Sequence, residues 1–231
     1  MNKKLKRFVY LLLSVMFLAG MLGIPGPATA GASEPLSSLT AGDTVSFAGY
    51  TWIVLDNGAA SGSSYLLMQD ALKDAGGNYI NVAFDSNFAP SFNNSTSVSV
   101  YLDTAFLDSL PKADQNLIQE HTWNTGGIGT DGTGNESSTT VKGYVGLISY
   151  SEYTAYSKYI SNLPATNGWW ILTPISGSPG GVWFAGPSGA IEYLDSNDTL
   201  AGTPKTLRPA LYLNSATLVS GGNGGAVAGS S

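Results

Sequence analysis

Hydrophobic and polar residues alternate near the start of the chain in the way expected of paired strands. Val45 and Phe47 alternate with polar neighbours, Gly49 marks a tight turn, and residues 50–55 continue the alternation around Trp52. Side chains that alternate in this way point to opposite faces of a strand, which predicts a half-buried β-hairpin. Residues 65–69 predict a further strand.

The spacing of apolar residues becomes helical in the middle of the chain. Apolar side chains recur every three or four residues between residues 97 and 111, which predicts an amphipathic helix. Residues 113–121 show the same spacing and predict a second helix that ends near His121. Residues 122–140 contain five glycines and no core pattern, so we expect a mobile surface loop there.

A third helix and a series of short strands are predicted in the second half of the chain. Ser149 and Glu152 have the spacing of a capping box, which predicts a helix that begins there and runs to about Asn162. Short strands are predicted at residues 144–148, 169–172, 181–185, 190–194 and 207–213. Strands, a helical middle and further strands indicate the α+β class. We expect a single compact domain of short antiparallel strands with two or three helices in the middle.

The first thirty residues have the pattern of a secretory signal peptide. Four basic residues precede residue 8, residues 8–24 form an uncharged and mostly apolar run, and Ala28 and Ala30 supply a small-residue cleavage pattern. The sequence therefore predicts secretion and cleavage after Ala30. An uncleaved membrane anchor is the alternative, because a run of this length is at the short end of the range that spans a bilayer.

The rest of the chain divides into three parts by composition. Residues 31–40 form a small-residue leader, residues 41–219 a single α+β domain, and residues 220–231 a flexible tail rich in glycine and serine. No second long apolar run follows the signal peptide, so we expect no membrane partner after its removal.

Charge and cysteine content narrow the classes of function. The chain has 231 residues, of which 11% are charged, and it contains no cysteine, so disulfides and thiolate metal sites are excluded. Without the signal peptide the chain carries six Lys or Arg and sixteen Asp or Glu, a net charge of −10. A surface of this charge repels phosphate, so we expect no nucleic-acid partner.

Three tryptophans and one arginine are candidate ligand-binding residues. Trp123 lies beside the glycine-rich segment and is the leading candidate for contact with a sugar ring, since loops carry function more often than cores do. Adjacent strand residues point to opposite faces, so we expect one of Trp169 and Trp170 in the core and the other exposed. Arg208 is the only arginine after the signal peptide. It either clamps an anionic ligand or forms a structural ion pair.

Acidic residues offer the remaining candidates. Asp131 and Glu136 in the glycine-rich segment, and the turn Asp195 to Asp198, supply oxygen ligands of the kind that calcium binds. Neither group has the spacing of the twelve-residue calcium loop, so we expect no cofactor, with calcium the one metal left open. We predict no catalytic residue.

Six motifs in order resemble a known bacterial family. They are Gly42-Asp43 leading into Trp52, Tyr101-Leu102-Asp103, Leu147-Ile148-Ser149, Trp169-Trp170 with Thr173-Pro174, Gly189, and Leu207-Arg208-Pro209. Together, over about residues 40–215, they resemble the family of secreted proteins called domain of unknown function 6273. That family commonly has arginine where this chain has Leu172.

The closing motif is also similar to a larger fold group, that of C-type-lectin-like and sulfatase-modifying proteins. This similarity implies a compact mixed domain whose terminal strands pair and whose long loops carry any ligand site. The formylglycine-generating branch uses cysteines, which this chain lacks. The calcium-dependent lectin branch uses proline triplets that do not occur here, and Thr125 follows Trp123-Asn124 where that branch has aspartate.

Three functions are compatible with the sequence. The leading hypothesis is a secreted, non-enzymatic binding domain whose partner is an extracellular glycan or a surface protein. The first alternative is a carbohydrate-active hydrolase that uses two carboxylates drawn from Asp131, Glu136, Glu152, Glu192, Asp195 and Asp198, placed about 5–9 Å apart across a groove. The second alternative is a passive structural module of a surface assembly.

Overall fold

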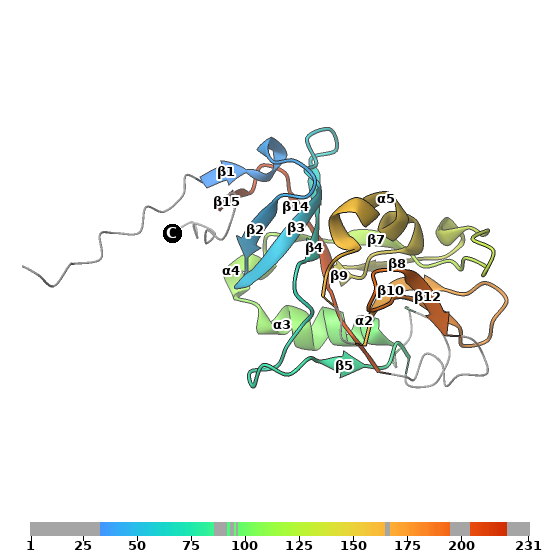
Figure 1. Ribbon diagram of the computed structural model, residues 1–231. Coiled ribbons are helices and arrows are strands. Elements are labelled where there is room, and N and C mark those ends of the chain that lie inside the picture. Colours follow the sequence, from blue (N-terminus) through green and yellow to red (C-terminus); the bar gives the residue numbers. More distant parts are fainter. Residues whose placement is uncertain are drawn as a thin grey trace, which may run out of the picture. The chain divides into compact units, whose positions relative to one another are not determined.

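The computed structural model describes residues 33–85, 92, 95, 97–164, 167–194 and 204–220. Within these ranges the chain is a mixed α+β fold in which short, mostly antiparallel strands form several sheets and short helices lie between them (Figure 1). The predicted α+β class is confirmed. The predicted signal peptide, the acidic turn from Asp195 to Asp198 and the tail from residue 221 lie outside the described residues.

The first sheet contains the predicted hairpin. Its strand order is β2-β3-β4-β14-β6, and β9 also pairs with β14. The bounds are β2 Thr44–Phe47, β3 Tyr50–Asp56, β4 Ser63–Met68, β6 Ile118–Gln119, β9 Val145–Gly146 and β14 Ala210–Asn214. Val45 faces Trp52 across the hairpin, as the alternation predicts. Ala48 and Gly49 both have positive φ, at 52° and 83°, which suits a two-residue turn between twisted strands.

The second sheet has the order β12-β11-β10-β13-β5. Its strands are β5 Asn81–Val82, β10 Trp169–Pro174, β11 Val182–Ala185, β12 Ile191–Leu194 and β13 Lys205–Thr206. β10 and β13 run parallel, whereas the other neighbours are antiparallel. β10 lies in the middle of this sheet and is buried on both faces, so both Trp169 and Trp170 are in the core. The prediction that one of this pair is exposed is therefore wrong.

The two ends of the described chain meet in a small sheet. β1 Ser33–Pro35 pairs with β15 Leu218–Ser220 in an antiparallel register, at one end of the ribbon (Figure 1). The next residues form a 3₁₀ turn, Leu36–Ser38, and Leu36 and Leu39 are buried in the core. Residues 33–39 of the expected leader thus contribute to the fold.

A continuous helical run follows the long polar segment. It consists of α2 Val98–Tyr101, a π-helical turn η2 Leu102–Phe106 and α3 Leu107–Ser109. The helix predicted at residues 97–111 is therefore confirmed, with a π turn in its middle.

The second predicted helix is largely wrong. Only α4 Lys112–Gln115 is helical there, and the chain then enters β6 and a further strand, β7 His121–Asn124. β7 pairs with β8 Thr140–Gly143, and β6 pairs with β14. These long-range strand pairings override the local helical spacing.

The glycine-rich segment between β7 and β8 is tied to the fold by backbone hydrogen bonds. The amide of Ile128 donates to the carbonyl of Pro174 at 3.1 Å, and the amide of Ser176 donates to the carbonyl of Ile128 at 3.0 Å. A short 3₁₀ turn, Glu136–Ser138, completes the segment, and Ile128 is buried. The expectation of a surface loop is wrong around Ile128, which is buried and bridges to Ile175 at the end of β10, whereas residues 130–135 are exposed.

Helix α5, Tyr150–Ile160, begins as predicted. The hydroxyl of Ser149 accepts a hydrogen bond from the amide of Glu152, while the Glu152 carboxylate accepts one from the amide of Ser149. Tyr153 on this helix packs against Trp169, which joins α5 to the second sheet. Within the described ranges, no helix is both long and apolar enough to cross a membrane.

Candidate functional site

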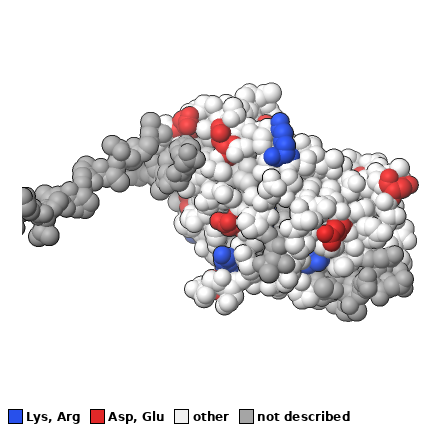
Figure 2. Space-filling model, viewed as in Figure 1, with Lys and Arg blue, Asp and Glu red and all other residues white. Residues whose placement is uncertain are grey.

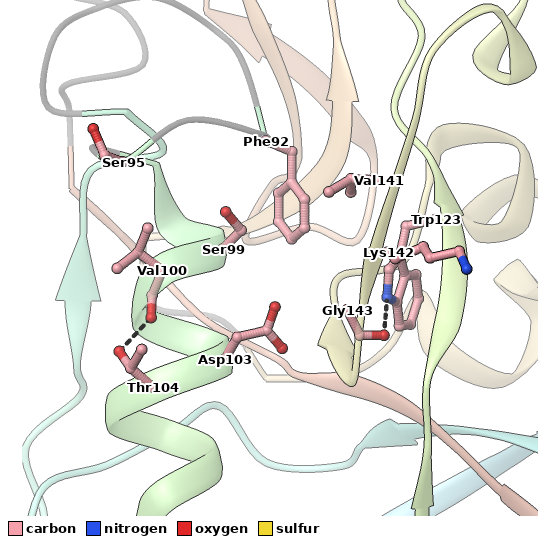
Figure 3. A pocket seen from close by; sticks show the side chains of 10 residues that line it. All are labelled: Phe92, Ser95, Ser99, Val100, Asp103, Thr104, Trp123, Val141, Lys142 and Gly143. Carbon is pink, nitrogen blue, oxygen red and sulfur yellow. Dashed lines mark hydrogen bonds between the residues drawn. The ribbon is translucent and has the colours of Figure 1, made fainter.

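A hollow in the described part of the chain lies between the helical run and the β7-β8 hairpin. This cavity has a volume of about 410 Å³, which is within the range of roughly 300–1,000 Å³ typical of small-molecule pockets. Its lining residues are Phe92, Ser95, Ser99, Val100, Asp103, Thr104, Trp123, Val141, Lys142 and Gly143 (Figure 3). We call it the Asp103 cavity.

Asp103 is the only described carboxylate that lines this cavity. Its Oδ1 accepts hydrogen bonds from the amides of Tyr144 and Val145, at 3.2 Å and 3.1 Å. These bonds fix the side chain and leave Oδ2 free to face the cavity, on the side of Gly143 (Figure 3). Burial raises the pKa of Asp103, and the two amide hydrogen bonds oppose that rise only in part.

The π-helical turn positions Asp103. The amide of Leu107 donates to the carbonyl of Leu102, five residues back, which widens this turn of the helix. Leu102 and Phe106 of the same turn are buried, so they anchor it in the core, while Asp103 is half-buried. π-helical turns inside α-helices are frequent at functional sites. The turn therefore presents a fixed carboxylate beside the hairpin.

Glycine at position 143 keeps that carboxylate accessible. A methyl group on residue 143 would lie 2.7 Å from Oδ2 of Asp103. A side chain there would cover the free oxygen or displace it. The absence of a side chain thus shapes the cavity wall.

Trp123 lines the cavity but does not offer a face to it. The residue is only 2% exposed, and its indole Nε1 donates to the carbonyl of Gly143 at 3.1 Å. A Cβ on residue 146 would lie 2.5 Å from the indole ring, so only glycine at this position leaves room for the ring. His121 and Tyr65 pack around the same ring, with centroids at 5.1 Å and 6.3 Å. Trp123 is therefore a floor of the cavity rather than an exposed stacking platform.

The other predicted tryptophans have structural contacts. Trp170 donates its indole hydrogen to the carbonyl of Val82 at 2.8 Å and packs against Phe84 and Phe184. Trp169 packs between Tyr153 and the guanidinium of Arg208, which lies 5.6 Å from its ring centre. Neither indole lines the Asp103 cavity.

Arg208 is fully buried and makes no ion pair with any described residue. It donates instead to the carbonyls of Met68 and Pro164, while its Nε has no hydrogen-bond partner among the described atoms. Burial lowers its pKa to about 10. The ion-pair interpretation is thus wrong for the described part of the chain. Arg208 still has a structural role, because it links the segment before β14 to Met68 and Pro164 through their backbone carbonyls.

The acidic residues proposed as ligand-binding or catalytic candidates lie partly on the surface and partly in the interior. Asp131 is exposed and accepts from the amide and hydroxyl of Thr133, at 2.9 Å and 2.7 Å, which lower its pKa. Glu192 is also exposed. Glu136 is buried beneath the start of α5.

Glu136 and Glu152 meet around Ser149 in what we call the α5 cluster. Glu136 accepts hydrogen bonds from the hydroxyls of Ser149 and Thr173. Glu152 accepts from the amide of Ser149 at 2.8 Å and from the hydroxyl of Tyr65 at 3.0 Å. Burial is the main cause of the raised pKa of Glu152, and the nearby charge of Glu136 adds to it. The cluster lies in the interior and caps the helix.

Two further observations bear on ligands. A second hollow of about 380 Å³, lined by Leu107, Gln115, Asn116, Ile118 and Tyr144, contains no charged side chain. Among the residues that the structure describes, no group of three or more His, Asp or Glu side chains is arranged to hold a metal ion.

Sequence reasoning identified Trp123 at this site but missed Asp103, Ser99 and Thr104. Asp103 is flanked by core positions of the helical stripe, so its spacing resembles that of an ordinary solvated helix position. The one sequence feature that could have pointed to Asp103 is the motif Tyr101-Leu102-Asp103, which is part of the family resemblance. The π turn that aims the carboxylate is not readable from the spacing.

Comparison of the chain with protein-family models, curated proteins and solved structures finds no match. The resemblance to domain of unknown function 6273 stays a prediction. Function is therefore inferred from the geometry of the site.

Proposed function

We propose that this protein is a secreted, non-enzymatic binding domain that recognises a glycan of the extracellular surface through the Asp103 cavity. The observation that carries the proposal is the fixed, half-buried carboxylate of Asp103 in a cavity lined by both apolar and polar side chains. Pockets that bind small molecules combine apolar lining with a few fixed polar groups in this way. Sugars also present both apolar C–H faces and hydroxyl donors.

The charge distribution supports a weakly charged ligand such as a glycan rather than a polyanion. Acidic and basic side chains are few and scattered on the face shown in Figure 2. The net negative charge of the chain disfavours nucleic acid. Secretion rests on the signal-peptide pattern, and the C-type-lectin-like architecture remains part of the proposal, supported by the pairing of the terminal strands β1 and β15.

The hydrolase alternative has less support. In its best candidate pair, Glu136 is buried and Glu152 is half-buried, and both carboxylates are occupied in capping α5. A paired-carboxylate mechanism needs both groups beside the scissile bond, with room for water. The Asp103 cavity offers one carboxylate among its described lining residues.

The test is a glycan array and a pull-down on cell-wall material, repeated with a variant that blocks the cavity. Thr104 is exposed at the cavity, and Thr104→Trp would fill it without entering the core. Thr154→Trp is the matched control, because Thr154 is also an exposed helical threonine whose hydroxyl donates to the carbonyl four residues back. We expect binding to be lost in the first variant and kept in the second. Equal binding by both variants would show that the glycan binds elsewhere on the protein.

A further inference from the structure

Asp103 and Thr104 offer hydrogen-bond acceptors in the Asp103 cavity, and the hydroxyls of Ser95 and Ser99 can donate as well as accept. Oδ2 of Asp103 accepts no hydrogen bond from a described residue and is open to the cavity. Thr104 donates its hydroxyl hydrogen to the carbonyl of Val100, which leaves its oxygen as an acceptor. The carbonyl of Gly143, by contrast, is occupied: it accepts from the indole of Trp123, and Gly143 pairs with His121 in the β7-β8 ladder.

The one cation of the lining is directed away from this carboxylate. The side chain of Lys142 is 71% exposed, its Nζ lies 3.7 Å from Glu120, and it extends past Trp123 away from the cavity (Figure 3). No described Lys, Arg or His forms an ion pair with Asp103. Asp103 is thus a half-buried carboxylate without a cationic partner among the described residues, and burial raises its pKa.

We infer that the ligand group that enters this cavity is a protonated amine, and that the glycan recognised is one that contains amino sugars with free amino groups. An ammonium group offers three donors and no acceptor, which complements the open carboxylate oxygen of Asp103 and the hydroxyl oxygen of Thr104. Its charge also compensates the partial desolvation of Asp103, since hydrogen bonds to charged partners are about twice as strong as neutral ones. Val100, which is 42% exposed, and the half-buried Val141 offer the sugar ring apolar contacts from the two sides of the cavity. This inference rests on the proposed glycan-binding function.

The experiment compares two oligosaccharides that differ only in the amine. Tetra-glucosamine and its fully N-acetylated counterpart are titrated into the purified protein by calorimetry at near-neutral pH. A lysine-containing tetrapeptide is a third probe. We expect the free-amine sugar to bind about tenfold or more tightly than the acetylated sugar and than the peptide, which corresponds to one charge-assisted hydrogen bond.

Asp103→Asn is expected to abolish the preference for the free amine. Asn keeps an oxygen for the amides of Tyr144 and Val145, so the fold should persist. Asp108→Asn is the matched control: it removes the same charge from an exposed position of the same helical run, where Asp108 pairs with Lys112. The control should keep the preference. If Asp103→Asn fails to fold, Thr104→Ala, at an exposed position, should still weaken free-amine binding.

Each of the other outcomes would refute a specific part of the proposal. Equal binding of both sugars refutes the amine inference and leaves glycan binding standing. Tighter binding of the peptide shows ammonium recognition without a sugar and refutes the amino-sugar assignment. An equal loss in Asp103→Asn and Asp108→Asn shows general electrostatic attraction. If no sugar binds here and none binds on the array, the proposed function itself fails.

Discussion

The Asp103 cavity and the α5 cluster both place carboxylates away from bulk water, but they differ in what the carboxylate oxygens bind. In the α5 cluster, Glu136 and Glu152 accept from hydroxyls and amides that belong to the fold. In the cavity, Oδ1 of Asp103 accepts hydrogen bonds from two backbone amides, and Oδ2 accepts none from a described residue. Burial of a carboxylate therefore does not by itself mark a binding site. The open oxygen of Asp103, which faces a cavity, is the feature that supports the proposed binding site.

Trp123 connects the two regions through Tyr65, and its removal should have the largest effect. Trp123→Ala deletes the cavity floor and also the ring that packs against Tyr65, the partner of Glu152. We expect a loss of about 3–5 kcal/mol in the free energy of unfolding, as for other buried aromatic residues. Urea unfolding followed by fluorescence measures it. A loss below about 1 kcal/mol would show that the two regions are not joined through this ring.

Within the α5 cluster, Glu136→Ala should destabilise the fold without changing the cavity. The substitution removes the acceptor for Thr173 and Ser149 and weakens the start of α5. We expect a loss of about 1–3 kcal/mol in unfolding free energy, while amino-sugar binding by the folded protein is unchanged. Urea unfolding and calorimetry give the two values. If Glu136→Ala loses amino-sugar binding under conditions in which it is fully folded, the α5 cluster and the Asp103 cavity are not independent.

The raised pKa of Glu152 gives the α5 cluster its own pH dependence. A carboxyl whose pKa is higher in the folded protein binds its proton more tightly there. Its contribution to stability is therefore full below the ordinary glutamate range and is lost as pH rises through the raised pKa. Glu152→Gln should make the decline of unfolding free energy with rising pH shallower. Glu192→Gln, at an exposed position, makes the same change in charge and serves as control. Identical slopes for wild type and Glu152→Gln would refute this.

Asp103→Asn should show the opposite pattern to Glu136→Ala. Because the amide oxygen can replace Oδ1 and because Oδ2 accepts no hydrogen bond from a described residue, we expect a change in unfolding free energy of less than about 1 kcal/mol. Ligand binding, in contrast, should be impaired. Thermal unfolding together with the calorimetric comparison tests both points, and a large loss of stability would place Asp103 among the structural carboxylates.

The smallest effect is expected at the rim of the cavity. Lys142 and Glu120 form an ion pair whose side chains are 71% and 50% exposed, and solvent screens such pairs strongly. Lys142→Ala should change the unfolding free energy by less than about 0.5 kcal/mol and should leave amine binding intact or slightly strengthened. Weaker amine binding in this variant would indicate that Lys142 contacts the ligand.

Local patterns account for the elements that were predicted correctly. The hairpin of β2 and β3 depends on alternation and a two-residue turn, and the start of α5 depends on Ser149 and Glu152, three residues apart. Residues 113–121 have helical spacing, yet β6 and β7 form there because β14 and β8 supply partners distant in the chain. Spacing alone contains no information about those partners.

The sequence by itself determined the α+β class, the first hairpin, the first helical run and the capped helix, because each depends on contacts between near neighbours. It also singled out Trp123. Only the tertiary structure decided which polar groups are free. It buried Trp169, Trp170 and Arg208, and it brought Asp103 from the helical run against Gly143 of β8. Whether a carboxylate oxygen is satisfied depends on residues some forty positions away, and that is why the candidate site emerged from the fold and not from the motifs.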